Sequence, residues 1–155
     1  MIISFDIDNT LIPYSDEFEV EEKKLLSRLL AAESIRKGTI DLFKTLKSKE
    51  HQIWIYTTSF RSVLSLKRTF KSYGLSPSRI INERINQQVL KKHNCRASKN
   101  PKLFGIDIHI DDSKGVGMEG EKYGFKTIIL ETNNKEWGEL VISQIELIEQ
   151  QQYDI

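Results

Sequence analysis

Two aspartates separated by one residue follow the first apolar segment of the chain. The stretch reads IISFDIDNTLI, and it places Asp6 and Asp8 at the end of what its composition predicts to be a buried strand. A buried carboxylate is costly unless it is paired, hydrogen-bonded or bound to a metal ion, and two neighbouring carboxylates also repel each other. A cation held between them would relieve both costs. Taken alone, the motif also fits a pair of exposed loop residues.

Polar residues end two further apolar segments in the same way. Thr57 and Thr58 follow the segment IWIY, and Asp111 and Asp112 follow the apolar run Ile106–Ile110. If these segments are neighbouring parallel strands, their carboxyl ends bring the polar groups to one crevice. Oxygen ligands without a cysteine or histidine cluster favour a hard cation, and Mg²⁺ fits best because it pairs with a few carboxylates and a substrate phosphate.

Short β-branched segments alternate with helical patterns along the chain. The predicted strands are Ile2–Ile7, Ile53–Tyr56, Arg79–Ile81, Ile106–Ile110 and Thr127–Leu130. The predicted helices cover residues 20–34, 39–49, 59–74, 115–124 and 135–150, with Gly38–Thr39 beginning the second, Ser59 capping the third and Gly74 ending it.

This alternation predicts an α/β fold. We expect one domain over residues 1–155, with a Rossmann-like, mainly parallel sheet of about five strands and helices on both faces. Ligands of such sheets bind at the carboxyl ends of the strands. The polar residues described above lie at those ends.

Composition narrows the class of protein. The net charge is +1, from 23 basic and 22 acidic residues, which argues against a bulk electrostatic grip on nucleic acid or an anionic membrane. The single cysteine, Cys95, excludes an internal disulfide and a multi-cysteine zinc site. The sequence contains no apolar run of the ~18 residues that a membrane span needs. Met1 leads directly into the first strand without a secretory leader, so we expect a cytoplasmic protein.

The ordered motifs resemble those of the haloacid dehalogenase-like (HAD) superfamily of phosphohydrolases, in a small capless form. The first HAD motif, D-x-D-x-T after an apolar strand, matches Asp6, Asp8 and Thr10. The second is a strand that ends in Thr or Ser, as at Thr57, and the third is a lysine upstream of the fourth, as at Lys102. The fourth is a strand that ends in paired acids, here "IDIHIDD".

The resemblance implies a Mg²⁺-dependent phosphatase that works through an aspartyl-phosphate. Asp6 would be the nucleophile and Asp8 the general acid and base. The carboxylates of Asp6 and Asp111 and the main-chain carbonyl of Asp8 would hold the metal. Asp112 would orient a water or the motif lysine from outside the metal's ligand shell. Thr57 and Lys102 would contact the phosphate, and Lys102 would also pair with Asp6.

Several assignments stay open at this level. Lys99 competes with Lys102 for the third motif, and Thr58 competes with Thr57 for the second. His109 lies between two isoleucines, so it is expected to pack against a helix and not to bind metal. Arg61 could touch substrate or be a solvated helix residue.

The segments that could carry a specificity cap are short. Two helical patterns use most of the chain between Thr10 and Thr57, which leaves residues 11–20 for a hairpin flap. An open site suits a phosphoprotein, a nucleic-acid phosphate end or a small phosphorylated molecule, or a site roofed by another subunit of a homo-oligomer. Tyr14 and Phe18 could stack on a substrate or pack against the first helix. The alternative functions are a catalytically weak module that binds phosphorylated partners and a phosphotransferase.

Overall fold

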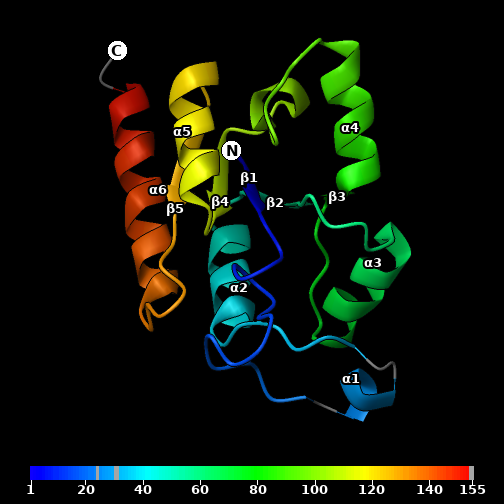
Figure 1. Ribbon diagram of the computed structural model, residues 1–155. Coiled ribbons are helices and arrows are strands. Elements are labelled where there is room, and N and C mark those ends of the chain that lie inside the picture. Colours follow the sequence, from blue (N-terminus) through cyan, green and yellow to red (C-terminus); the bar gives the residue numbers. More distant parts are fainter. Residues whose placement is uncertain (24, 30–31, 154–155) are drawn as a thin grey trace.

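Five parallel strands form the centre of the computed structural model, which describes residues 1–23, 25–29 and 32–153 (Figure 1). The strands are β1 (Ile2–Phe5), β2 (Gln52–Tyr56), β3 (Arg79–Ile81), β4 (Ile108–Asp111) and β5 (Lys126–Ile129). Their order in the sheet is β3-β2-β1-β4-β5, and every neighbouring pair is parallel. The predicted α/β Rossmann-like class and its five strands are confirmed.

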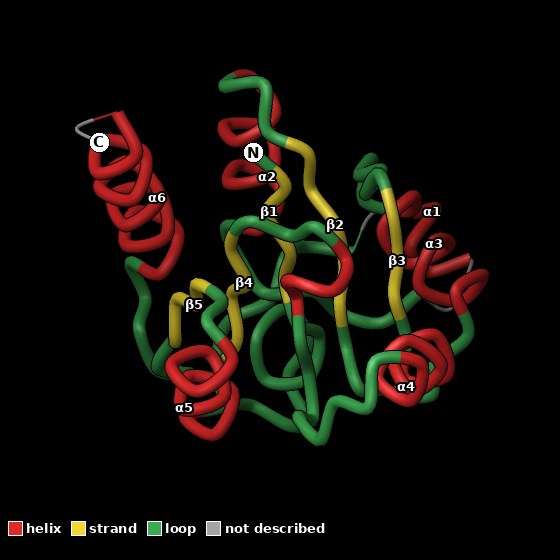
Figure 2. The backbone as a smooth tube through the Cα atoms, turned by 90° about the horizontal axis from the view of Figure 1, so that it is seen from above, coloured by secondary structure: helices red, strands yellow, loops and turns green. Residues whose placement is uncertain are grey.

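Helices cover both faces of this sheet (Figure 2). One face carries α2 (Thr39–Ser48), α3 (Val63–Ser72) and α6 (Trp137–Tyr153), and the other carries α4 (Glu83–Lys92), the 3₁₀ turn η1 (Pro101–Phe104) and α5 (Lys114–Tyr123). Among the described residues, no helix combines the length and the apolar character that crossing a membrane requires.

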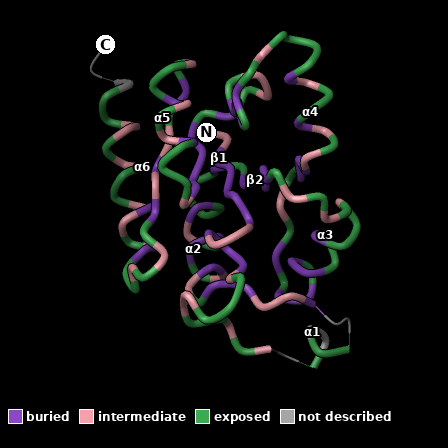
Figure 3. The backbone as a smooth tube through the Cα atoms, in the orientation of Figure 1, coloured by how far each residue is buried: buried purple, intermediate pink, exposed green. Residues whose placement is uncertain are grey.

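Alternation along the strands divides the apolar side chains between two cores. Ile53 and Ile55 of β2 belong to the larger core, which α2, α3 and α6 complete. Trp54 and Tyr56 point to the opposite face and pack near α4 and η1. Successive strand residues face opposite sides of a sheet, so a strand buried on both faces is apolar throughout. The buried strands and the exposed outer surfaces of the helices are distinguished in Figure 3.

The first predicted helix is much shorter in the structure than in the sequence-based prediction. Residues 20–34 were predicted as helical, but α1 covers only Leu25–Leu29, and positions 24, 30 and 31 lie outside the described residues. The flanks are extended because they pair with each other: Glu21 N donates to Ile35 O (2.8 Å), and Lys37 N donates to Glu19 O (2.8 Å). We call residues 19–37 the insertion. It leaves the core and returns to it through this antiparallel contact.

The hairpin flap predicted over residues 11–20 stays a prediction about domain organisation, but its backbone can be described. Residues 14–18 form bends. In the described part of the chain, two isolated bridges involve this segment, Ile12 with Asp8 and Val20 with Arg36, and neither joins two residues of 11–20. The antiparallel contact between Val20 and Arg36 therefore lies where the insertion joins the core.

One helix begins later than predicted, and another helix was not predicted. Helix α3 begins at Val63 because Ser62, not Ser59, caps it: Ser62 Oγ accepts a hydrogen bond from Ser65 N (3.1 Å). Helix α4 was not predicted, since its exposed face is polar and few apolar residues mark its period. Its N-cap was a readable signal, because Asn82 Oδ1 accepts from Ile85 N (3.3 Å).

Gly120 should be essential for the contact between α5 and β5. A Cβ built at this position lies 2.9 Å from the carbonyl oxygen of Phe125, a backbone atom that cannot rotate away. We expect Gly120→Ala to lower the free energy of unfolding by ~1–3 kcal/mol, because overpacking outweighs the gain in helix propensity. Gly138→Ala in α6 is the control: nothing lies within 4 Å of its Cβ, and it should stabilise by ~0.5 kcal/mol. Urea unfolding measures both, and equal effects would contradict the packing argument.

Candidate active site

The register between β1 and β4 brings Asp6 next to Asp111. Phe5 lies opposite Ile110 in the parallel ladder, and Asp6 N donates to Ile110 O (2.8 Å). The next residue of each chain segment is an aspartate: Asp6 directly follows β1, and Asp111 is the last residue of β4. Both side chains point to the face opposite the larger core, because they alternate with Phe5 and Ile110.

A buried lysine joins the two carboxylates. Lys99 Nζ lies 2.6 Å from Asp6 Oδ1 and 2.5 Å from Asp111 Oδ2, and the side chains of Lys99 and Asp111 are 4% and 1% exposed. The sequence-based choice of Lys102 for this position is wrong. Lys102 lies exposed on η1, and the alternative, Lys99, occupies the site. Pro101 begins the 3₁₀ turn and carries Lys102 away from the strand ends.

A buried polar network fixes the loop that carries Lys99. Asn100 N donates to the hydroxyl oxygen of Tyr56 (2.9 Å), and that hydroxyl donates to Asn86 Oδ1 (2.6 Å). Asn86 Nδ2 in turn donates to Ser98 O (2.8 Å). The residues on both sides of Lys99 are thereby tied to β2 and α4. Sequence reasoning missed Tyr56 and Asn86, because neither belongs to a motif; a buried Asn in α4 could be recognised only once α4 itself was known.

His109 supports Asp111 from inside the sheet. Its Nε2 lies 3.0 Å from Asp111 Oδ2, and its Nδ1 lies 2.8 Å from Ser4 Oγ. Burial lowers the pKa of His109, so the ring is neutral near pH 7. A neutral ring carries one N–H, and a carboxylate can only accept, so Nε2 donates to Asp111 and Nδ1 accepts from the Ser4 hydroxyl. His109 packs against Tyr56, with ring centroids 5.3 Å apart, which agrees with the packing role expected for it.

A third carboxylate completes an acidic cluster. One ligand oxygen from each of Asp6, Asp111 and Asp112 lies within 4.8 Å of the others. Thr10 Oγ1 donates to Asp112 Oδ1 (3.4 Å), which ties the D-x-D-x-T motif to the paired acids. Asp112 was predicted to lie outside the metal's ligand shell, and the geometry places it in the group that could hold a cation directly.

The cluster carries more negative charge than Lys99 balances. Burial raises the pKa of Asp6 despite the attraction of Lys99, and the neighbouring Asp111 raises it further. Burial and Asp111 also raise the pKa of Asp112. Burial acts in the same direction on Asp111, but the hydrogen bond from His109 and the charge of Lys99 outweigh it and hold the pKa of Asp111 below its ordinary value. The attraction of Asp6 and Asp111 outweighs burial at Lys99 and raises its pKa, so Lys99 is charged.

Asp8 is paired with a different cation. Its Oδ1 lies 2.7 Å from Nη1 of Arg61, which also contacts Glu33 of the insertion. Arg61, left open as a substrate contact or a solvated residue, is therefore neither free nor fully solvated: its side chain is 26% exposed.

The two threonines after β2 differ in burial. Thr57 is buried, and its Oγ1 accepts from Ser59 N (3.1 Å), which leaves its hydroxyl hydrogen available to donate. Thr58 is exposed. Because Phe5 pairs with Ile55, Thr57 lies at the same edge of the sheet as the acidic cluster.

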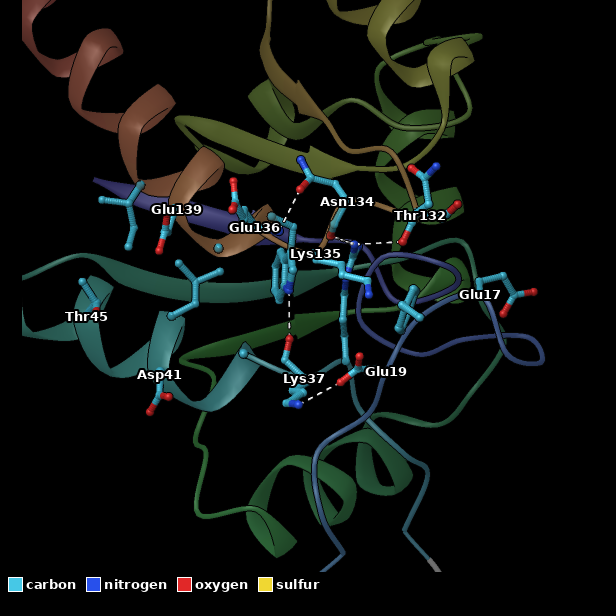
Figure 4. A pocket seen from close by; sticks show the side chains of 18 residues that line it. Glu17, Glu19, Lys37, Asp41, Thr45, Thr132, Asn134, Lys135, Glu136 and Glu139 are labelled. Atoms are coloured by element: carbon cyan, nitrogen blue, oxygen red, sulfur yellow. Dashed lines mark hydrogen bonds and ion pairs between the residues drawn. The ribbon is translucent and has the colours of Figure 1, made fainter.

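A cavity away from the acidic cluster lies on the side of the larger core. It measures about 660 Å³ between α2, the start of α6 and residues 17–19, and none of the acidic cluster lines it (Figure 4). The buried guanidinium of Arg36 fills its wall, 4.4 Å from the ring centre of Phe18 and 4.8 Å from that of Trp137. Phe18 therefore packs on Arg36, whereas Tyr14 is 70% exposed.

His109 should make stability fall with acid. Its folded pKa is lowered, so the unfolded chain binds a proton that the folded chain excludes. The free energy of unfolding should fall as the pH drops below the unfolded value of ~6.5 toward the folded pKa, by up to ~1.4 kcal/mol per pH unit. His109→Gln should remove this part of the slope between pH 7 and 5 in urea unfolding without metal. His93→Gln, which replaces an exposed ring, should retain it, and equal slopes for the two variants would exclude His109 as the source.

Comparison with known proteins extends the description of the fold. Comparisons with protein-family models and with curated proteins gave no match. Among solved structures, the chain is similar to a structure described as a predicted HAD-like family hydrolase from Porphyromonas gingivalis. The two are 14% identical, the match covers 93% of this chain and 96% of that one, and the TM-score is 0.50. The chain therefore has a HAD-like fold.

Proposed function

We propose that the protein is a Mg²⁺-dependent phosphatase that hydrolyses phosphomonoesters through an aspartyl-phosphate on Asp6. The observation that carries this proposal is the buried contact of Lys99 with Asp6 and Asp111 beside a third carboxylate, Asp112. A phosphoryl group carries negative charge on its oxygens, and its transfer needs positioned cations more than covalent help.

The residues present fit a magnesium ion. The donor set consists of carboxylate oxygens, which Mg²⁺ prefers. Lys99 balances one of the three carboxylates of the cluster, and a divalent cation would balance the other two. Asp6, Asp111 and Asp112, with the main-chain carbonyl of Asp8, would hold the ion. When bound, Mg²⁺ would neutralise charge on the phosphoryl oxygens.

The first half of the reaction transfers the phosphoryl group to the protein. An oxygen of the Asp6 carboxylate attacks phosphorus, and the bond from phosphorus to the leaving oxygen breaks. Asp8 gives a proton to that oxygen, so the product leaves as an alcohol. Lys99 and the Thr57 hydroxyl donate to the phosphoryl oxygens and limit repulsion between the phosphate and Asp6.

The second half releases phosphate by hydrolysis. Asp8, now a carboxylate, takes a proton from water as the water oxygen attacks phosphorus. The bond between phosphorus and Asp6 breaks, which restores the carboxylate of Asp6 and the proton on Asp8. The presence of Asp8 supports turnover by water and favours a phosphatase over a module that only binds phosphate.

The surroundings of the site support a proposal about how open it is to substrates. The insertion is short, and the exposed ring of Tyr14 extends from the turn after Asp8, where Tyr14 N donates to Asn9 Oδ1 (3.2 Å). We propose an open site that accepts a phosphorylated small molecule, a phosphoprotein or a nucleic-acid end, in a cytoplasmic protein that can form homo-oligomers.

A phosphatase screen with Mg²⁺ tests the proposed function. We expect hydrolysis of p-nitrophenyl phosphate and of at least one natural class among nucleotides, sugar phosphates, phosphopeptides and phosphorylated DNA ends. EDTA should abolish the activity, and Asp6→Asn should abolish it without loss of the fold, because an amide cannot form the phosphoryl-enzyme. Activity that survives both treatments would refute the mechanism.

Lys99 and Lys102 form a matched pair for testing the third motif. Lys99→Met leaves two buried carboxylates without their cation, so kcat should fall by ~10²–10³-fold and the free energy of unfolding by ~3–5 kcal/mol. Lys102→Met removes an exposed charge and should change neither by much. Steady-state kinetics and urea unfolding give both quantities. A larger fall in kcat for Lys102→Met than for Lys99→Met would assign the catalytic role to Lys102.

A further inference from the structure

Two adjoining ion pairs connect Asp8 to the insertion. Nη1 of Arg61 lies 2.7 Å from Asp8 Oδ1, and Nε of Arg61 lies 3.0 Å and 2.9 Å from the two carboxylate oxygens of Glu33. Nη2 lies 2.9 Å from Glu33 Oε1. The three residues belong to three separate segments: the turn after β1, the loop before α3 and the end of the insertion. Glu33 therefore fixes the edge of the guanidinium that carries Nε and Nη2, and Nη1 holds Asp8.

The backbones of these segments are fixed as well. Arg61 N and Nη1 both donate to Ser59 Oγ, at 3.2 Å and 2.8 Å, and Asn82 Nδ2 donates to Arg61 O (3.0 Å). On the other side, the hydroxyl of Tyr73 donates to Glu33 O (3.2 Å). The main chains of Arg61 and Glu33 are thus fixed, and both carboxylates hold the guanidinium, before any substrate binds.

Glu33 limits how far Arg61 can turn toward a phosphate that enters the site. An arginine with Asp8 as its sole anionic partner would be free to turn toward an incoming phosphate dianion. Bidentate contact with a carboxylate is strong and directional, and it occupies Nε and Nη2 of Arg61. The remaining nitrogen, Nη1, is already shared between Asp8 and Ser59. This geometry favours a fixed support for Asp8 over a mobile ligand for phosphate.

We propose that Arg61, held by Glu33, is a positioning residue that fixes the Asp8 carboxylate for proton transfer. The inference rests on the proposed phosphatase function and makes the insertion part of the catalytic apparatus. Among the residues that the structure describes, Arg61 supplies the side-chain hydrogen bond to Asp8, through Oδ1. The other carboxylate oxygen is the one that exchanges a proton with the leaving group and with water. Proton transfer depends on placement within a fraction of an ångström, so a freely rotating Asp8 would be a poor acid and base.

The dependence on the leaving group tests this role. We expect Arg61→Gln to lower kcat/KM by ~10–100-fold for an alkyl phosphate, because alkoxide leaving groups need the proton from Asp8. The loss should be clearly smaller for p-nitrophenyl phosphate, whose leaving group needs little protonation. Glu33→Gln should show the same selectivity with a smaller loss, and Arg61→Lys should lie between wild type and Arg61→Gln, since an ammonium cannot hold both carboxylates in one plane. Arg68→Gln, which changes an exposed arginine of α3, should leave both substrates unaffected.

A double variant asks whether Arg61 acts through Asp8. In an Asp8→Asn background, Arg61→Gln should lower kcat/KM for p-nitrophenyl phosphate by no more than about twofold, because the group that it positions is already lost. If Arg61→Gln instead raises KM for this ester by the same factor in both backgrounds, Arg61 binds the phosphate directly and the inference is wrong.

Failure of the inference can be distinguished from failure of the proposed function. A wild-type protein that is inactive on the whole phosphatase panel would overturn the proposed function and the inference with it. An active wild type in which Arg61→Gln and Glu33→Gln lose equal factors on the alkyl and aryl esters would overturn the inference alone. If Arg61→Gln does not fold, Arg61→Lys and Glu33→Gln decide the same question.

Discussion

A lysine ammonium buried between two carboxylates is the interaction on which the rest of the site depends. Removing Lys99, Asp6 and Asp111 from water is costly, and close contact among them offsets that cost only while all three stay in place. The contact requires β1 and β4 to be neighbours with matched register, and it requires the loop before η1 to cross their carboxyl ends. The network of Tyr56 and Asn86 meets the second requirement, since it holds the residues that flank Lys99.

The surroundings of Lys99 and its two carboxylates carry more negative than positive charge, which suits the proposed phosphoryl-transfer site. The raised pKa values of Asp6 and Asp112 both follow first from burial and then from nearby negative charge. His109 favours the ionised form of Asp111, because its Nε2 donates to the carboxylate and burial keeps the ring neutral. In the proposed function, a hard divalent cation would relieve the repulsion that remains and would bring the phosphate to Asp6.

Two arginines, Arg36 and Arg61, connect the insertion to the core. Arg36 is buried, donates to the carbonyl oxygens of Thr132 (3.0 Å) and Asn134 (2.8 Å), and has its pKa lowered to about 10 by burial. It anchors the segment by which the insertion returns to the core. Arg61 then connects the insertion to Asp8. In the proposed mechanism, a short insertion can therefore influence catalysis through Arg61 and Asp8.

The sequence by itself determined the α/β class, the five strands and the polar residues at their carboxyl ends, because apolar periodicity and strand-end polarity are local features. It favoured Lys102 over Lys99 for the third motif, and it contained no sign that Arg61 would meet Asp8. Tertiary structure decided both points. Pro101 turns the chain before Lys102, while hydrogen bonds from distant residues hold Lys99 over the sheet edge. Such contacts depend on how separate elements pack. The three-residue spacing between Lys99 and Lys102 carries no information about that packing.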